Sequence, residues 1–195
     1  DIAEYLVDTF RDAKEYGSLL MVKRDKYSTL SDQLEALAPM DKLLYQARTE
    51  QLIHQAEILS QKYTISVTNP PYLASGKFST SLKSYANKYY EVSKADLYSI
   101  FMEVCLDLTI EQGYISMINM QSWMFLSGQE KLRNLLQENS SMLNMIHLGP
   151  GAFPEMVGDV LQTTTFTLRK GATNLSGDYI RVTDVRDSDK KEKLS

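Results

Sequence analysis

The sequence predicts an α/β fold in which helices pack on a sheet. From residue 63 onward, short β-branched stretches alternate with segments of helical periodicity. Their order is strand, helix, strand, helix, strand, strand, which is typical of helices packed on a sheet. The 195 residues are 43% hydrophobic and 24% charged, so the chain is long and apolar enough to bury a core.

Composition and charge exclude several classes of protein. With 21 basic and 25 acidic residues the net charge is −4, which excludes a wholly basic nucleic-acid coat protein but not a local basic patch. The single cysteine, Cys105, excludes an internal disulfide framework. His54 and His147 lack ligand spacing, so we expect no metal site. No apolar run or leader suits a membrane, so we expect a cytoplasmic protein without a membrane partner.

Residues 1–62 are predicted to form a helical segment or insertion. Apolar residues of its first helix share one face: Ile2, Leu6, Phe10 and Ala13. A second helix is expected to begin at Ser31. A third is expected at Asp41, a residue type that favours helix N-caps.

Residues 63–183 are predicted to contain the sheet. The expected strands are 63–68, 114–120, 143–148, 160–169 and a short one at 179–182. Between them, one helix is expected to begin with Ser93 as N-cap and to end at Gly113, and a capping box at Ser127–Glu130 predicts another. Residues 184–195 form a charged tail that we expect to be frayed.

The sharpest feature is the tetrapeptide Asn69-Pro70-Pro71-Tyr72, which directly follows the predicted strand 63–68. Ligands of α/β proteins bind at the carboxyl ends of strands, so this position favours a site. Asn69 carries a side-chain acceptor, Pro70 offers a carbonyl without a competing N–H, and the two prolines hold both rigidly. Tyr72 can stack on an unpaired base. These groups suit an exocyclic nucleobase amine, because they accept its hydrogens and stabilise its developing positive charge.

Two other interpretations of the tetrapeptide are open. It also fits a plain strand-terminating turn, or a proline-rich docking peptide. A docking peptide normally lies in a disordered segment, whereas this one follows an apolar strand. The context therefore favours the catalytic interpretation.

The four residues resemble the catalytic motif of the amino-group (N6-adenine) DNA methyltransferases. Further segments carry the resemblance: Lys94–Tyr98, Phe101–Glu103, Gln112–Ile115, Gln121–Trp123, His147–Gly149, Ala152–Pro154 and Val160–Arg169. Gln112 replaces the first glycine of the family's Gly-Gly turn. The match spans about residues 63–170, and together with Gln46-Ala47 and Ala56–Leu59 it looks most like the PglX-type methyltransferase of BREX phage-exclusion systems.

The resemblance implies the second half of a Rossmann-like S-adenosylmethionine-dependent methyltransferase sheet, mostly parallel with one antiparallel strand. It implies that Asn69 and the Pro70 carbonyl accept hydrogen bonds from the adenine N6 amine. Tyr72 would stack on the flipped adenine, and Phe153 would pack on its other face. Phe101, with Asn69, would contact the cofactor. From the pattern alone Phe101 also fits core packing, and Phe153 fits a loop anchor.

The family's cofactor-binding motifs are not found before Asn69. These are a Gly-containing loop after the first strand and an acidic residue after the second, and Gly17 is the only glycine before Gly76. We therefore expect this chain alone neither to bind S-adenosylmethionine tightly nor to methylate. Residues 63–183 would be the catalytic part of a larger methyltransferase domain.

Residues 73–92 are interpreted as a loop next to the motif. From residue 77 to residue 94 the chain carries four lysines against one acid, a net charge of +3, with interleaved tyrosines. We expect DNA contacts from Lys77, Lys83, Lys88 and Tyr89, because lysines neutralise phosphates and tyrosines stack. A solvated flexible loop is the alternative.

These observations predict a fragment of a site-specific DNA adenine-N6 methyltransferase in phage defence or restriction–modification. DNA is the expected partner, and other phage-defence subunits are candidates. A methyltransferase-like DNA- or partner-binding module without activity is one alternative. A protein-glutamine methyltransferase is another, since the tetrapeptide also resembles the motif of release-factor methyltransferases.

Overall fold

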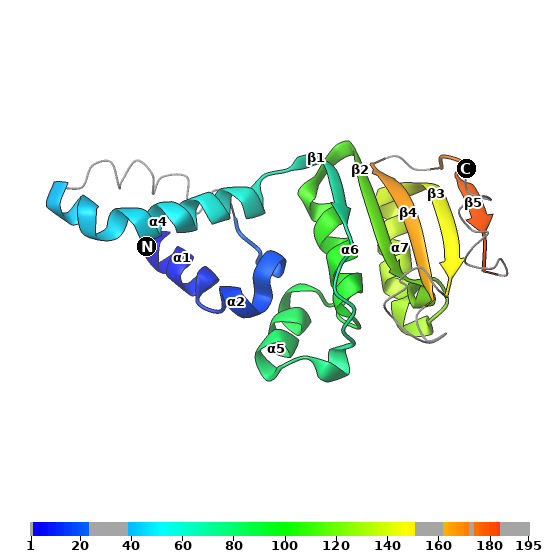
Figure 1. Cartoon of the computed structure of the whole chain (residues 1–195), viewed down its shortest axis with the longest axis horizontal. Helices are drawn as coiled ribbons and strands as arrows, with labels where there is room; N and C mark the ends of the chain where they lie inside the picture. The colour runs from blue at the N-terminus through cyan, green and yellow to red at the C-terminus, as the bar shows by residue number, and fades with distance from the viewer. Residues whose placement is uncertain (1, 24–38, 151–161, 172–173, 184–195) are drawn as a thin grey trace. The chain divides into compact units, whose positions relative to one another are not determined.

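The computed structural model describes residues 2–23, 39–150, 162–171 and 174–183 (Figure 1). The chain divides into two compact units, Asp1–Lys62 and Tyr63–Ser195. Within the described residues no helix is long and apolar enough to cross a membrane.

The first unit is helical. Its elements are α1 (Ile2–Phe10), α2 (Ala13–Tyr16), the 3-10 helix η1 (Gly17–Leu19) and α4 (Pro39–Ser60). Leu6 and Phe10 of α1 are buried, as their spacing predicts. Helix α4 begins at Pro39, earlier than the expected Asp41, and proline is well tolerated at the start of a helix. The helix expected at Ser31 lies outside the described residues.

The second unit contains a five-stranded sheet of order β1-β2-β4-β3-β5. The strands are β1 (Tyr63–Thr68), β2 (Thr109–Met120), β3 (Ser140–Gly149), β4 (Thr163–Lys170) and β5 (Asp178–Arg181). Strand β4 runs antiparallel to both neighbours, while β1 pairs with β2 and β3 with β5 in parallel. The described sheet is therefore mixed, with β4 as the one antiparallel strand that was expected, although two of the four strand pairings are antiparallel.

Only β1 begins where expected; β3 and β5 begin at Ser140 and Asp178, three residues and one residue early, and β2 and β4 differ more instructively. Strand β2 starts at Thr109, directly after the preceding helix, so Gly113 lies inside a strand and does not end a helix. The left-handed residue in this stretch is Gln112, with φ 65°. Strand β4 starts at Thr163, and Gln162 before it is not in a strand; residues 160–161 of that predicted strand, like the charged tail 184–195, lie outside the described residues.

The segment interpreted as a loop contains the ten-residue helix α5 (Thr80–Tyr89) and the 3-10 helix η3 (Ser75–Lys77). The Ser79 side chain caps α5 by accepting a 3.0 Å hydrogen bond from the Leu82 amide. Leu82 and Ala86 are buried, and they recur at helical spacing. The loop prediction is wrong because only these residues mark the inner face of the helix.

Both predicted caps of the later helices are also wrong. Helix α6 (Leu97–Leu108) is capped by Asp96, whereas the Ser93 hydroxyl bonds Glu103 at 2.5 Å. Helix α7 (Glu130–Asn139) follows the 3-10 helix η5 (Ser127–Gln129), and no capping-box side-chain bond forms there. The Gln129 amide instead turns inward and donates to the Ser99 hydroxyl at 2.8 Å.

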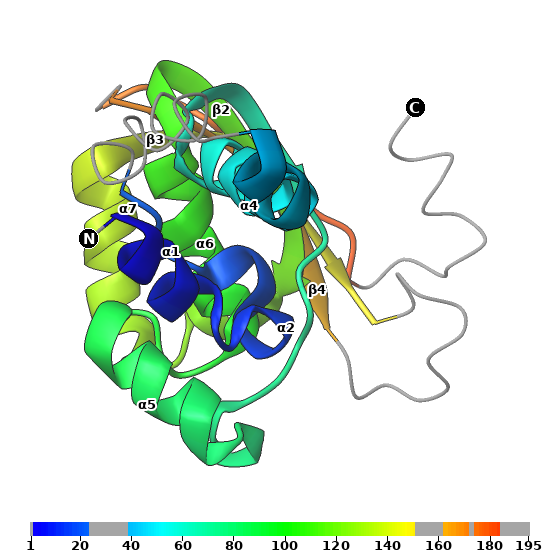
Figure 2. The same ribbon diagram turned by 90° about the vertical axis from the view of Figure 1, so that its left-hand side faces the viewer.

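Helices α6 and α7 pack side by side on one face of the sheet and enclose the core (Figure 2). The core side chains are Tyr98, Met102, Cys105, Leu106, Ile115, Met117, Trp123, Leu132, Leu136, Phe166 and Leu168. Trp123, in the 3-10 helix η4 (Gln121–Met124), packs on Phe166 with ring centroids 5.3 Å apart. Cys105 is a core thiol as predicted, and burial raises its pKa to about 11.

Candidate active site

The Asn69–Tyr72 motif directly follows the carboxyl end of β1 and belongs to no helix or strand. Asn69 and Pro71 are exposed, Pro70 is buried and Tyr72 is half-buried. Two adjacent prolines restrict the backbone here and supply no N–H donors. The Asn69 side chain is therefore presented to solvent from a stiff segment that is anchored through Pro70.

The Tyr72 hydroxyl lies between the motif and the neighbouring strand. It is 3.2 Å from Asn69 Oδ1 and 3.1 Å from the Ile118 carbonyl of β2, so its single proton is shared between these two acceptors. Burial raises the pKa of Tyr72 to about 12, so the hydroxyl stays protonated and acts as a donor. Asn69 Oδ1 has two lone pairs, so this contact orients the amide and leaves one acceptor site for a substrate N–H.

The ring of Tyr72 packs edge-on against Tyr98 of α6, with centroids 6.1 Å apart and planes at 88°. Tyr98 is buried, and its hydroxyl bonds Ser122 Oγ at 2.8 Å. Helix α6 thus supports one edge of the Tyr72 ring. The half-exposed ring retains surface on which a base can stack.

Asp96 ties the segment after the motif to α6. Its carboxylate accepts from the Leu73 amide at 3.1 Å and from the Tyr98 amide at 3.3 Å. The Leu97 amide returns a bond to the Leu73 carbonyl at 3.0 Å. Burial raises the pKa of Asp96, and the backbone N–H bonds oppose that rise. Asp96 is a positioning residue that the sequence did not single out, although an Asp before a helix is a cap signal.

A polar row crosses the sheet at the same end. The Gln121 side chain contacts both His147 of β3 and Gln162, and the Gln121 amide donates to the Gln162 carbonyl at 2.9 Å. Buried beside this row, Asn119 and Thr164 face each other across β2 and β4, and their side-chain polar atoms have no hydrogen-bond partner. None of these roles was predicted; the Gln121–Trp123 resemblance marked the region only.

The two predicted aromatic contacts have different outcomes. Phe101 on α6 is half-buried and packs against the core cluster, which leaves part of its ring accessible. Core packing and cofactor contact are both compatible with that position. Phe153 lies outside the described residues.

The predicted DNA-contacting residues lie on ordered helices. Lys77 ends η3, while Lys83, Lys88 and Tyr89 are exposed on α5. Lys88 Nζ lies 4.9 Å from the Tyr89 ring centroid, and the Tyr85 and Tyr89 rings are 4.6 Å apart. The structure thus brings Lys88 and Tyr89 together on the element that follows the motif. Among the described residues, no group of His, Cys, Asp and Glu side chains could hold a metal ion.

Comparison with known proteins identifies the family. Residues 6–153 match the Eco57I restriction-modification methylase family. The chain belongs to this family.

Two curated relatives of this Eco57I-family chain are adenine-specific methyltransferases. PglX of Lacticaseibacillus casei (strain Zhang) is 43% identical over 153 residues, covering 78% of this chain and 13% of that protein. BrxX of Escherichia coli O9:H4 (strain HS) is 38% identical over a 209-residue alignment, covering all of this chain and 17% of that protein. The predicted PglX-type resemblance is confirmed. The chain spans less than a fifth of either relative's length.

The fold of the Eco57I-family chain is also found in a solved structure. A putative class I S-adenosylmethionine-dependent methyltransferase from Listeria monocytogenes superposes with a TM-score of 0.52 at 12% identity, covering 70% of this chain and 42% of that one. The likeness shows a shared fold. The family match itself includes Asn69–Tyr72, α5 and α6, whereas β4 and β5 lie beyond residue 153.

Proposed function

We propose that the chain is the catalytic part of a DNA methyltransferase that acts on the N6 amine of a flipped-out adenine. The observation that carries this proposal is the placement of Asn69, exposed on a proline-stiffened segment at the end of β1, with its amide oriented by Tyr72. The adenine-specific relatives at 43% and 38% identity support the same chemistry.

The motif supplies acceptors for a weak nucleophile. The lone pair of an adenine amine is delocalised into the ring, so the amine must be oriented before it reacts. Asn69 Oδ1 and the Pro70 carbonyl accept its two hydrogens and direct the lone pair away from the protein. Tyr72 stacks on the ring and holds the base outside its duplex. No general base is required, because the alkylated amine is acidic and loses its proton afterwards.

Bound S-adenosylmethionine would supply the methyl group, but the described residues fit only part of that cofactor. Phe101, which is half-buried, would offer one aromatic contact, and the exposed Asn69 would border the transferred methyl group. Strand β1 is an edge strand on which Ile65 and Val67 are 61% and 70% exposed. The unpaired backbone of an edge strand is a site for further strand pairing, and exposed apolar side chains on one face of that strand leave a surface for further packing.

We infer that the cofactor is held mainly by strands that pair with β1, and that this chain is the second half of a Rossmann-like sheet. Residues 1–62 would then be a helical insertion before the catalytic part, residues 63–183. Isothermal calorimetry checks this inference: the 195-residue chain should not bind S-adenosylmethionine at micromolar concentration. Micromolar binding by the chain alone would contradict it.

DNA is the proposed substrate, and Lys77, Lys83, Lys88 and Tyr89 are its proposed contacts. The lysines are exposed beside the motif, where they can neutralise backbone phosphates. The relatedness to PglX, BrxX and the Eco57I family supports a role in phage defence or restriction–modification, with other defence subunits as candidate partners.

The test is methyl transfer from labelled S-adenosylmethionine to unmethylated DNA by the full-length protein that contains this chain. The Asn69→Ala variant should lose transfer, whereas Asn134→Ala, which removes an exposed asparagine of α7, should retain it. Label on a protein glutamine would favour a protein methyltransferase. Tight DNA binding without any transfer, in a folded and cofactor-loaded protein, would favour a binding module.

A further inference from the structure

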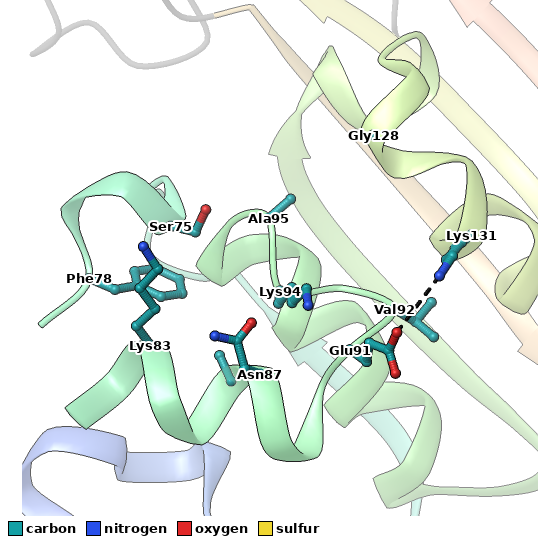
Figure 3. Close-up of a pocket in the computed structure, with 11 residues that line it drawn as sticks. Ser75, Phe78, Lys83, Asn87, Glu91, Val92, Lys94, Ala95, Gly128 and Lys131 are labelled. Atoms are coloured by element: carbon teal, nitrogen blue, oxygen red, sulfur yellow. Dashed lines mark ion pairs between the residues drawn. The ribbon is translucent and has the colours of Figure 1, made fainter. Parts of the chain in front are cut away.

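A cavity of about 440 Å³ is lined by α5 and by residues on either side of that helix in the chain (Figure 3). Its wall combines the continuous stretch from η3 through α5 to the start of α6 with a segment distant in sequence, from η5 to the start of α7. A volume of this size falls in the range of small-ligand sites, roughly 300–1,000 Å³, and suits one nucleotide. Neither the sequence nor the proposed catalytic role accounts for it.

The cavity has an excess of positive charge. Lys83, Lys94 and Lys131 line it from three different elements, together with one acid, Glu91. Glu91 pairs with Lys131 at 3.9 Å, as the dashed line in Figure 3 marks. Within the described part of the chain, Lys83 and Lys94 form no ion pair. Two unneutralised ammonium groups on one concave surface favour an anion there.

The remaining wall matches a nucleotide phosphate better than a bare anion. The Asn87 amide and the Ser75 hydroxyl add uncharged donors on the rim. The Phe78 ring and the Val92 side chain provide an apolar surface, against which a sugar or a base can pack. Donors and an apolar wall in one cavity fit a phosphate with its attached nucleoside.

The cavity is joined to the motif through backbone hydrogen bonds. Ser75 follows Tyr72 closely in the chain, and its amide donates to the Ala95 carbonyl at 3.0 Å. Ala74 and Asp96 form an isolated antiparallel bridge in the same place. The rim of the cavity is therefore held in fixed register with the segment that presents Asn69.

We propose that this cavity binds one backbone phosphate of the DNA strand that carries the target adenine, through Lys83 and Lys94. This inference rests on the proposed function, since it takes DNA as the substrate. Glu91 weakens phosphate binding in the cavity, because its carboxylate repels the phosphate and forms an ion pair with Lys131.

The first test measures DNA affinity as a function of salt. In the 195-residue chain, the double variant Lys83→Gln/Lys94→Gln should bind a duplex more weakly, and its slope of log K against log salt should be smaller by about 0.9, the effect of one phosphate contact. The matched control Lys14→Gln/Lys23→Gln removes the same charge from exposed positions of the first unit and should leave the slope unchanged. Glu91→Gln should bind more tightly than the wild type. Equal slopes for the two double variants would overturn the proposal.

The second test identifies the source of the phosphate. The side-chain amide resonance of Asn87 is followed by NMR while deoxyadenosine monophosphate or a short oligonucleotide is added. The oligonucleotide should saturate the shift at a concentration at least about tenfold lower, because it offers several phosphates to the lysines around the site. Tighter saturation by the mononucleotide would overturn the DNA assignment in favour of a free-nucleotide site.

These results separate the two proposals. If the salt slope changes as expected but the full-length protein transfers no methyl group, the cavity assignment stands and the catalytic one fails. If methyl transfer to DNA occurs and depends on Asn69, while the cavity variants bind DNA like the wild type, the cavity assignment fails alone.

Discussion

Asp96 carries the connection between the motif and the helical layer, so its removal has a calculable cost. In Asp96→Ala, the Tyr98 amide loses the N-cap bond at the start of α6, and the Leu73 amide loses the bond that fixes the segment after Tyr72. An N-cap substitution to alanine costs about 1 kcal/mol. A second, half-buried amide left without an acceptor costs about 1 kcal/mol more.

The sum, about 2 kcal/mol, should lower Tm by roughly 4–8 °C in a chain of this size. Asp96→Asn keeps one acceptor oxygen and removes a carboxylate whose pKa burial raises, so its Tm at neutral pH should stay close to that of the wild type. The assay is thermal unfolding of the 195-residue chain, followed by circular dichroism.

Ser79→Ala is the matched control for Asp96→Ala. Ser79 caps α5 by accepting a bond from the Leu82 amide, and removal of this cap should cost about 1 kcal/mol. Equal losses in Asp96→Ala and Ser79→Ala would refute the reasoning, because the bond to Leu73 would then contribute nothing.

Three further substitutions test the packing and the electrostatics. Gly113→Ala should lower the free energy of unfolding by about 1–3 kcal/mol, because the added Cβ would lie 2.7 Å from the Thr64 backbone oxygen. Urea titration measures this loss. A variant as stable as the wild type would contradict the register of β1 and β2. Thr164→Val should raise the free energy of unfolding by about 1 kcal/mol, because the buried Thr164 hydroxyl has no hydrogen-bond partner. The control Thr163→Val loses a hydrogen bond to the Gly149 carbonyl and should not raise the free energy of unfolding. Burial raises the pKa of Glu103 above its ordinary 4.5, so the native state binds the proton more tightly and loses stability as pH rises through that window. Glu103→Gln should therefore show a smaller fall in Tm between pH 4 and pH 7, and an unchanged fall would contradict the assignment.

Local sequence determines the strand that carries the motif. Tyr63–Thr68 is β-branched and is stopped by the two prolines, so its bounds follow from nearest neighbours alone. Gln112 is a second position where the local backbone conformation and the residue type are linked. By the resemblance it replaces a glycine, and its φ of 65° lies in the region that glycine adopts at the lowest cost.

Long-range contacts determine what the sequence could not predict. Ser93 and Asp96 are both N-cap residue types, and the choice between them depends on bonds to Glu103 and to Leu73 that bring separate segments together. The Ile118 carbonyl that anchors Tyr72 comes from another strand. Helix α5 was missed because its outer face carries exposed lysines and tyrosines, which obscure its short apolar face.

The central claim is that Asn69 acts as a hydrogen-bond acceptor for the adenine amine. The most direct measurement is mass spectrometry of N6-methyladenine in DNA treated with the full-length protein, compared among the wild type, Asn69→Asp and Asn69→Ala. Aspartate retains an oxygen acceptor of the same reach, so we predict measurable product for Asn69→Asp and none for Asn69→Ala. Equal product from all three proteins would contradict the account.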